Sequence, residues 1–215
     1  MTKYLAGARA VAPLALAAAS FGAAFGVLAE TAGMGVLAPI VMSATTFAGA
    51  AQFAAASVID EGGSVLAAVG AAVLLNGRYA AIGAAIAPDF HGSRVRRFLE
   101  SQLIVDESWA VAQVGGGRID RRVLVGAGLV LFPFWVGGTA LGVLFGDVLG
   151  DPERFGLDAA FPALFLALLA TQLVSRGAGL AALAGGLIAF VLIPIAPPGV
   201  PVIAAAAVCL AGLRR

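Results

Sequence analysis

Long stretches without a charged residue are the feature that most limits how this chain can fold. A helix needs about 20 consecutive apolar residues to cross the hydrocarbon core of a membrane, and charge-free stretches of about that length recur along the 215 residues. Charged residues make up 12% of the chain, against about a quarter in a soluble domain. One soluble core of this size could not bury the 61% of residues that are hydrophobic. The sequence therefore predicts an all-α polytopic integral membrane protein.

These stretches predict about seven transmembrane helices, or six if residues 31–59 form a re-entrant hairpin that enters and leaves on one side. The stretches are 10–29, 31–59, 62–88, 123–146, 159–175, 177–193 and 199–213, and Arg78 is the one charge within them. As a helix the last stretch would be only about 22 Å long, at about 1.5 Å per residue, which is short for a crossing.

An internal repeat favours seven crossings. Residues 22–28 (GAAFGVL) resemble residues 138–144 (GTALGVL), and each segment lies in the first helix of a three-helix unit. With seven crossings the second unit is inverted relative to the first, an arrangement typical of transporters; a chance match in a Gly- and Ala-rich chain is the alternative. A single transmembrane domain is expected, with units at about 10–88 and 123–193, a connection carrying a short amphipathic helix at 89–122, and a final helix at 199–213. The glycines of the match are expected to pack helices closely: Gly22, Gly26, Gly138 and Gly142.

The positions of the basic residues predict the orientation, because Lys and Arg in short loops stay in the cytoplasm. Six arginines flank the connection, which is therefore expected to be cytoplasmic: Arg94, Arg96, Arg97, Arg118, Arg121 and Arg122. Seven crossings would place Lys3 and Arg9 outside, whereas a hairpin at 31–59 would bring both inside. The charge count favours the hairpin and the repeat favours seven crossings, so the side of the N-terminus stays open here.

The second stretch contains an unusual number of polar and small residues, together with Pro39. A broken helix there would expose backbone groups that membranes tolerate only around a cavity, and such breaks often form substrate sites. Close helix packing is the alternative interpretation. The candidate residues for a substrate pathway in this stretch are Ser43, Thr45, Thr46, Gly49 and Gln52.

Arg78 is the most informative single residue, because a charge inside a membrane span is costly and usually functional. With Asn76 and Tyr79 it forms a polar cluster. Its guanidinium is suited to bind a carboxylate through two hydrogen bonds. An internal ion pair, or a helix that ends early, would explain it equally well without a substrate.

The segment 101–114 has the spacing of an amphipathic helix that lies flat or re-enters the membrane. Its carboxylates, Asp106 and Glu107, are candidates for proton coupling or gating, although carboxylates on such a helix often form a solvated face.

Several classes of protein are not expected. A net charge of +1 provides no basic surface for nucleic acid. The one cysteine and one histidine offer no set of metal ligands. The sequence has no Walker A motif and no hydrolase motif of the H-E-x-x-H or G-x-S-x-G type. Neither an enzyme nor a cofactor is expected.

The motifs resemble the AzlC family of branched-chain amino acid exporters. The matching segments are MSATTFAGAAQF at 42–53, Asn76-Gly-Arg78-Tyr79, Ala87-Pro88, Asp106-Glu107 and Phe161-Pro162-Ala-Leu-Phe165. The resemblance implies a large subunit in the bacterial cytoplasmic (inner) membrane that exports leucine, isoleucine, valine or analogues with a small AzlD-type membrane partner. The pathway would then include Arg78, Asn76 and residues 45–52, with Gln172 opposite them. A passive solute channel, or a membrane assembly subunit without transport activity, remains the alternative.

Overall fold

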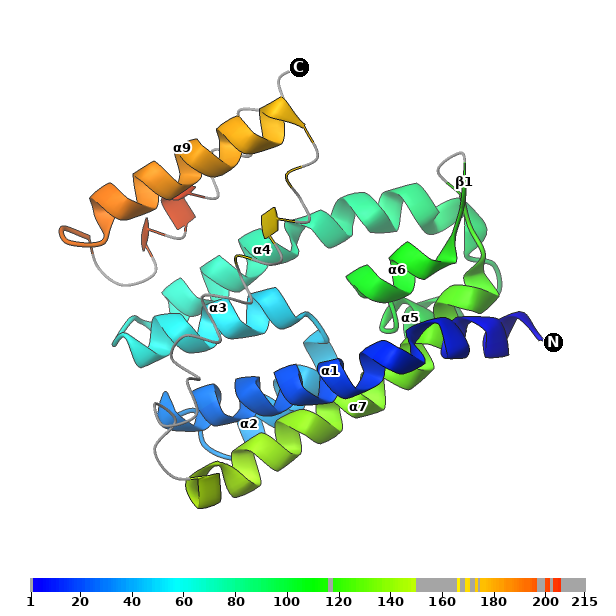
Figure 1. Ribbon diagram of the computed structural model, residues 1–215, viewed down its shortest axis with the longest axis horizontal. Coiled ribbons are helices and arrows are strands. Elements are labelled where there is room, and N and C mark those ends of the chain that lie inside the picture. Colours follow the sequence, from blue (N-terminus) through cyan, green and yellow to red (C-terminus); the bar gives the residue numbers. More distant parts are fainter. Residues whose placement is uncertain are drawn as a thin grey trace.

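The computed structural model describes residues 2–115, 118–149, 166, 169–170, 173, 175–196, 200–201 and 203–205. These residues are almost entirely helical (Figure 1), apart from one short antiparallel pair of strands. The elements are α1 (Lys3–Thr31), α2 (Leu37–Thr46), α3 (Gly49–Asp60), α4 (Val65–Ile86), the 3-10 helix η1 (Ala87–Asp89), α5 (Arg94–Ser101), α6 (Asp106–Ala112), β1 (Gln113–Gly115), β2 (Arg118–Ile119), α7 (Arg121–Leu149) and α9 (Arg176–Leu192).

Three of the described helices, α1, α4 and α7, are long and apolar enough to cross a membrane. The helix α9 is apolar but has 17 residues. The prediction of a helical membrane protein is therefore confirmed at that level, while the number of crossings in the whole chain stays a prediction. The predicted span at 159–175, with Gln172, and most of the predicted final helix at 199–213 lie outside the described residues.

The second predicted span is a hairpin of two short helices. With 10 and 12 residues, α2 and α3 would be about 15 and 18 Å long, roughly half of a hydrocarbon core of about 30 Å. Between them Phe47 takes the left-handed conformation, with φ 43° and ψ 51°, and the chain turns back. In Figure 1 α3 returns to the end of the molecule at which α2 began. A crossing by residues 31–59, which the repeat favoured, is therefore wrong, because neither helix is long enough and the turn reverses the chain.

The helices α1 and α7 lie side by side along their lengths (Figure 1). Gly22 and Gly26 face α7, and Gly138 and Gly142 face α1. A Cβ atom at any of the four would collide with a backbone carbonyl oxygen of the opposite helix. Small residues at such positions let helix backbones approach closely, so the contact depends on the absence of these side chains.

This contact also gives the direction of the two helices. Gly7 faces Val123 near the start of both helices, and Gly26 faces Thr139 farther along both, so α1 and α7 run parallel. The predicted inversion of the two matching segments is therefore wrong. The hairpin explains the error: since residues 31–59 do not cross, α4 alone reverses the direction of α1, and α7 then runs parallel to α1.

Both α1 and α7 begin at the end of the molecule that carries the connection between α4 and α7, here called the arginine-rich end. Lys3 Nζ lies 2.5 Å from an Asp120 carboxylate oxygen, and this ammonium holds the pKa of the Asp120 carboxyl below its usual range. The N-terminus therefore lies on the same side as the arginine-rich connection, as the charge count favoured.

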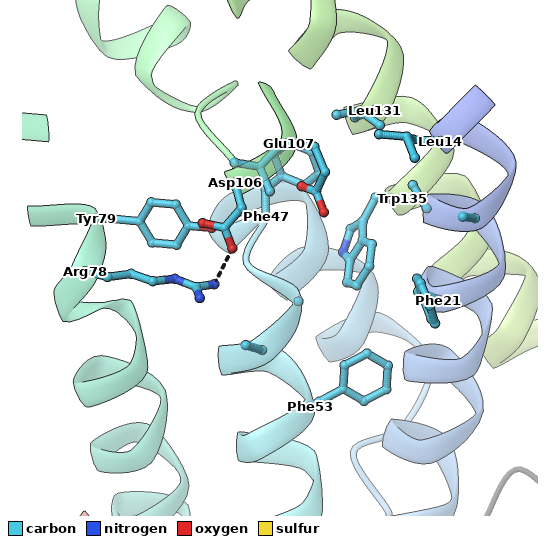
Figure 2. A pocket seen from close by; sticks show the side chains of 15 residues that line it. Leu14, Phe21, Phe47, Phe53, Arg78, Tyr79, Asp106, Glu107, Leu131 and Trp135 are labelled. Atoms are coloured by element: carbon cyan, nitrogen blue, oxygen red, sulfur yellow. Dashed lines mark ion pairs between the residues drawn. The ribbon is translucent and has the colours of Figure 1, made fainter. Parts of the chain in front are cut away.

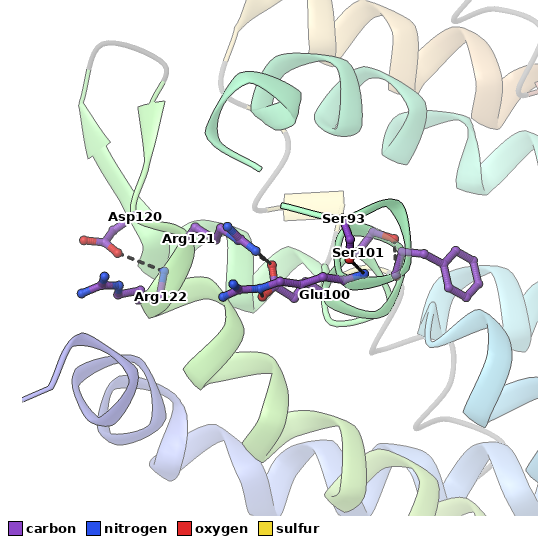
Figure 3. Close-up of polar contacts among 8 residues, drawn as sticks. Ser93, Glu100, Ser101, Asp120, Arg121 and Arg122 are labelled. Atoms are coloured by element: carbon purple, nitrogen blue, oxygen red, sulfur yellow. Dashed lines mark hydrogen bonds and ion pairs between the residues drawn. The ribbon is translucent and has the colours of Figure 1, made fainter. Parts of the chain in front are cut away.

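The connection contains two helices rather than one amphipathic helix at 101–114. The first, α5, ends at Ser101, and α6 begins only at Asp106. The Ser108 hydroxyl accepts a hydrogen bond from the Val105 N–H at 2.9 Å and so caps α6. Glu100 in α5 pairs with Arg121 at the start of α7 (Figure 3), so α5 is held against the end of a membrane-spanning helix.

Candidate functional site

A cavity of about 170 Å³ lies at the tip of the hairpin, between α1, α3, α4, α6 and α7 (Figure 2). Most of its wall is apolar. The large apolar side chains that line it are Leu14, Phe21, Phe47, Phe53, Leu131 and Trp135. At Gly49 the turn comes so close to α7 that a Cβ atom would lie 2.8 Å from the Trp135 ring. The left-handed residue at 47 and the glycine at 49 thus place the tip against α7.

One side of the cavity carries charge. Arg78 in α4 forms an ion pair with Asp106 at the start of α6, with 2.9 Å between nitrogen and oxygen. The Arg78 guanidinium also lies 5.1 Å from the centre of the Tyr79 ring. The two charged side chains are 38% and 35% exposed, so the pair is only partly buried. Their charges therefore compensate each other while both groups remain available to a ligand.

Glu107 provides a second carboxylate on the same side. In Figure 2 its side chain points into the cavity, toward Trp135. Its side chain is exposed on one side, and the protein atoms packed around the rest of it desolvate the carboxyl, which raises the pKa of Glu107 above its usual range. The neighbouring Asp106 raises it further, and Arg78 partly offsets the effect. Within the described residues, no three His, Cys, Asp or Glu side chains lie close enough together to hold a metal ion.

A buried polar network joins the hairpin to α7 beside the cavity. The fully buried Gln52 donates to the Ser43 hydroxyl at 2.8 Å and accepts from the Trp135 indole N–H at 3.1 Å. Ser43 and Thr139 share a hydrogen bond of 2.8 Å. The side-chain carbonyl oxygen of Gln52 also accepts a hydrogen bond from the backbone N–H of Ala48 at 3.2 Å. This bond satisfies a backbone donor at the turn. The network therefore holds both the hairpin tip and one wall of the cavity.

Gln52→Leu is expected to destabilise the fold, because the Trp135 indole N–H and the Ala48 N–H would lose their buried acceptor, while Ser43 would keep its bond to Thr139. Each unsatisfied buried group costs about 1–3 kcal/mol, which for a chain of this size lowers Tm by roughly 5 °C or more. Thermal unfolding of the purified protein in detergent measures the effect. Thr45→Val is the matched control, since the exposed Thr45 hydroxyl donates to the Val41 carbonyl of its own helix and to no other described residue. Equal Tm values for the two variants would contradict the structural role of Gln52.

Comparisons with known proteins identify the family. A family model described as AzlC protein matches residues 13–149, more than half of the chain. The chain belongs to the AzlC family. The AzlC match spans α1 to α7 and so includes every element that lines the cavity. It makes the chain a member of a transport-associated family of membrane proteins.

Relatives agree with this family. An "Uncharacterized membrane protein" of Archaeoglobus fulgidus is 33% identical over 90% of this chain and 86% of its own length. The "Branched-chain amino acid transport protein AzlC" of Bacillus subtilis is 25% identical over 76% of this chain and 65% of its own length. An "Uncharacterized membrane protein" of Haemophilus influenzae is 28% identical over 69% of this chain and 62% of its own length. No solved structure matches the chain.

The structure of this AzlC-family chain brings together some of the residues that the sequence singled out. Those that line the cavity are Gly49, Arg78, Tyr79, Asp106 and Glu107. Ser43 and Gln52 are fully buried in the network beside the cavity. Thr45, Thr46 and Asn76 are not among the lining residues; Asn76 lies about 200° around α4 from Arg78. Gln172 lies outside the described residues.

The apolar wall of the cavity was not predicted. Leu14, Phe21, Phe53 and Trp135 look like ordinary lipid-facing or packing residues in apolar stretches. The one signal that could have been used is Trp135, because tryptophan in membrane proteins prefers the two interfaces, whereas Trp135 lies near the middle of α7. A tryptophan at that depth indicates a polar partner for its indole N–H, and here that partner is Gln52.

Proposed function

We propose that this chain exports branched-chain amino acids, or close analogues, across the bacterial cytoplasmic membrane, as the large subunit of a pair with a small AzlD-type membrane protein. The observation that carries the proposal is an accessible Arg78–Asp106 pair in the wall of an otherwise mainly apolar cavity. The name of the Bacillus subtilis relative, a branched-chain amino acid transport protein, supports the same substrate class.

The cavity matches the chemistry of an amino acid with an aliphatic side chain. The Arg78 guanidinium suits the substrate carboxylate through two parallel hydrogen bonds, and Asp106 or Glu107 suits the ammonium group. The rings of Phe21, Phe53 and Trp135 suit the aliphatic part, since specific sites combine apolar walls with few polar groups. The volume of about 170 Å³ is also adequate, because a cavity of about 150 Å³ takes up benzene.

The experiment that tests this function is amino-acid efflux from cells supplied with a dipeptide that contains leucine or isoleucine. The chain is expressed either alone or together with its small partner. Cells that express only the partner are the control. Saturable efflux that needs both proteins is the expected result. Unsaturable flux would identify a passive channel instead, and unchanged accumulation with the folded pair in the membrane would exclude this substrate class.

Glu107 is proposed to couple export to protonation. Its raised pKa keeps the carboxyl protonated to a higher pH than an ordinary Glu, for which the pKa is about 4.3. The group is neutral below the raised value and charged above it, and the titratable groups that act on it within the described residues are Arg78, Asp106 and Tyr79. Wild-type flux in proteoliposomes is therefore expected to change at a pH above the ordinary carboxyl range.

Glu107→Gln is expected to flatten this pH profile, because the amide cannot release a proton. Glu61→Gln is the control, since Glu61 is an exposed carboxylate at the opposite end of the hairpin. A profile in Glu107→Gln identical to that of the wild type would leave Glu107 with no part in coupling.

A further inference from the structure

A second hollow lies outside the candidate substrate cavity, at the arginine-rich end, where the end of α4 meets α5. Its volume is about 310 Å³. The floor is apolar and is formed mainly by Gly83, Ile86 and Phe90. The other wall is one face of α5, with Arg94, Arg97, Phe98 and Ser101, which have the spacing i, i+3, i+4 and i+7 of a single helix face. This hollow is called the α4–α5 groove below.

The two arginines of the groove are available to a ligand. Arg94 and Arg97 are exposed, and neither forms an ion pair with any residue in the part of the chain that the structure describes. The other arginine of α5, Arg96, pairs with Glu100 at 3.0 Å. Two unneutralised guanidinium groups one helical turn apart are suited to bind a phosphate.

The apolar residues of α5 are also uncovered. Val95, Phe98 and Leu99 are 68%, 63% and 60% exposed, although the rest of this short helix is charged or polar. A helix with a basic side and an exposed apolar side typically lies in the interface of a membrane, with the apolar residues among the acyl chains. Exposure of three large apolar side chains to water would instead be unfavourable.

The position of α5 agrees with such an interface. Its Glu100 pairs with Arg121, the first residue of α7, and the groove floor includes the last turn of α4. Both α4 and α7 are candidate membrane spans, so α5 lies where these spans end. Basic pockets between membrane helices at this depth are suited to anionic lipid headgroups.

We propose that the α4–α5 groove binds an anionic phospholipid of the adjacent leaflet. The headgroup phosphate lies between Arg94 and Arg97, and an acyl chain passes over Phe98 and the apolar end of α4. The lipid neutralises the two guanidinium groups and covers Phe98, while Val95 and Leu99, outside the groove, face the acyl chains of the surrounding leaflet. This site is separate from the substrate cavity, with which it shares no lining residue.

Thermal unfolding of the purified full chain in detergent tests the proposal. Phosphatidylglycerol is compared with phosphatidylcholine, which has no net charge, and with soluble glycerol phosphate at the same concentration. Phosphatidylglycerol is expected to raise Tm by roughly 5 °C over phosphatidylcholine, since a ligand that binds only the folded state stabilises it. Glycerol phosphate is expected to have little effect because it lacks the acyl chain.

Two variants assign the effect to the groove. Arg94→Gln combined with Arg97→Gln removes the charges, and Ser101→Phe fills the groove without changing its charge; both are expected to abolish most of the rise in Tm. Arg122→Gln, at the same end but outside the groove, is expected to retain it. Equal effects of the two lipids on the wild type, or a full rise in both groove variants, would overturn the proposal. A full rise with glycerol phosphate would show a site for free phosphate instead of lipid.

Discussion

Replacement of Arg78 by glutamine is expected to abolish amino-acid export while the protein remains folded in the membrane. Arg78 is the cationic member of the accessible ion pair in the cavity, and glutamine cannot form two charge-assisted hydrogen bonds with a carboxylate. Each bond of this kind contributes about 1.5–3 kcal/mol, and about 1.4 kcal/mol corresponds to a factor of ten. Loss of both bonds, together with an uncompensated Asp106, therefore predicts a fall in flux of about a hundredfold or more.

Two matched variants make this result specific. Arg122→Gln removes the same charge at an exposed position outside the cavity and is expected to export normally. Arg78→Lys keeps the charge but loses the planar fork of donors, so intermediate flux is expected. Flux is measured as initial efflux of labelled leucine from cells that contain equal amounts of membrane-inserted protein. Normal flux in Arg78→Gln would remove Arg78 from the substrate site.

Gly138→Val is expected to separate α1 from α7 and to lower the yield of folded protein sharply. A Cβ atom at Gly138 would collide with the Ala19 carbonyl oxygen, whereas one at the adjacent Gly137 would meet no atom within 4 Å. Overpacking of a tight contact costs about 1–3 kcal/mol, and more where the obstacle is backbone that cannot change rotamer. A decrease in Tm of about 5–10 °C relative to the wild type is expected.

Gly137→Val is the control for this contact, because it introduces the same side chain one residue earlier in the same helix. The loss of glycine flexibility and the helix propensity of valine are then equal in both variants, so any difference reports the contact between helices. The measurements are the monodisperse fraction in size-exclusion chromatography and Tm in detergent. If the two variants behave alike, the α1–α7 contact does not limit stability.

The hairpin illustrates what could not be predicted from the sequence. Residues 31–59 are uncharged and long enough to cross, and both interpretations satisfied the rules of length and hydropathy. The decision rests on a left-handed residue at 47, on the hydrogen bond between Ser43 and Thr139, and on the hydrogen bond that the Trp135 indole N–H donates to Gln52. These partners are 96 and 83 residues away along the chain, and no local periodicity encodes such a distance.

The candidate site was only partly predictable for a related reason. Arg78, Asp106 and Glu107 stand out because charge is rare in apolar sequence and costly in lipid. Phe53 and Trp135 do not stand out in the same way, since an apolar side chain is equally suited to lipid, to helix packing and to a cavity wall. Only the arrangement of α1, α3 and α7 separates these environments.

From the amino-acid sequence alone follow the class of helical membrane protein, the rare charged residues in and beside its apolar stretches, and the arginine-rich connection. These properties follow from single segments, because lipid requires each spanning backbone to satisfy its own hydrogen bonds and excludes charge along its length. The parallel direction of α1 and α7, the return of the hairpin, and the ion pair of Arg78 with Asp106 could be known only from the folded chain. Those depend on close contacts and buried hydrogen bonds between segments far apart in the chain, where lipid provides no comparable rule.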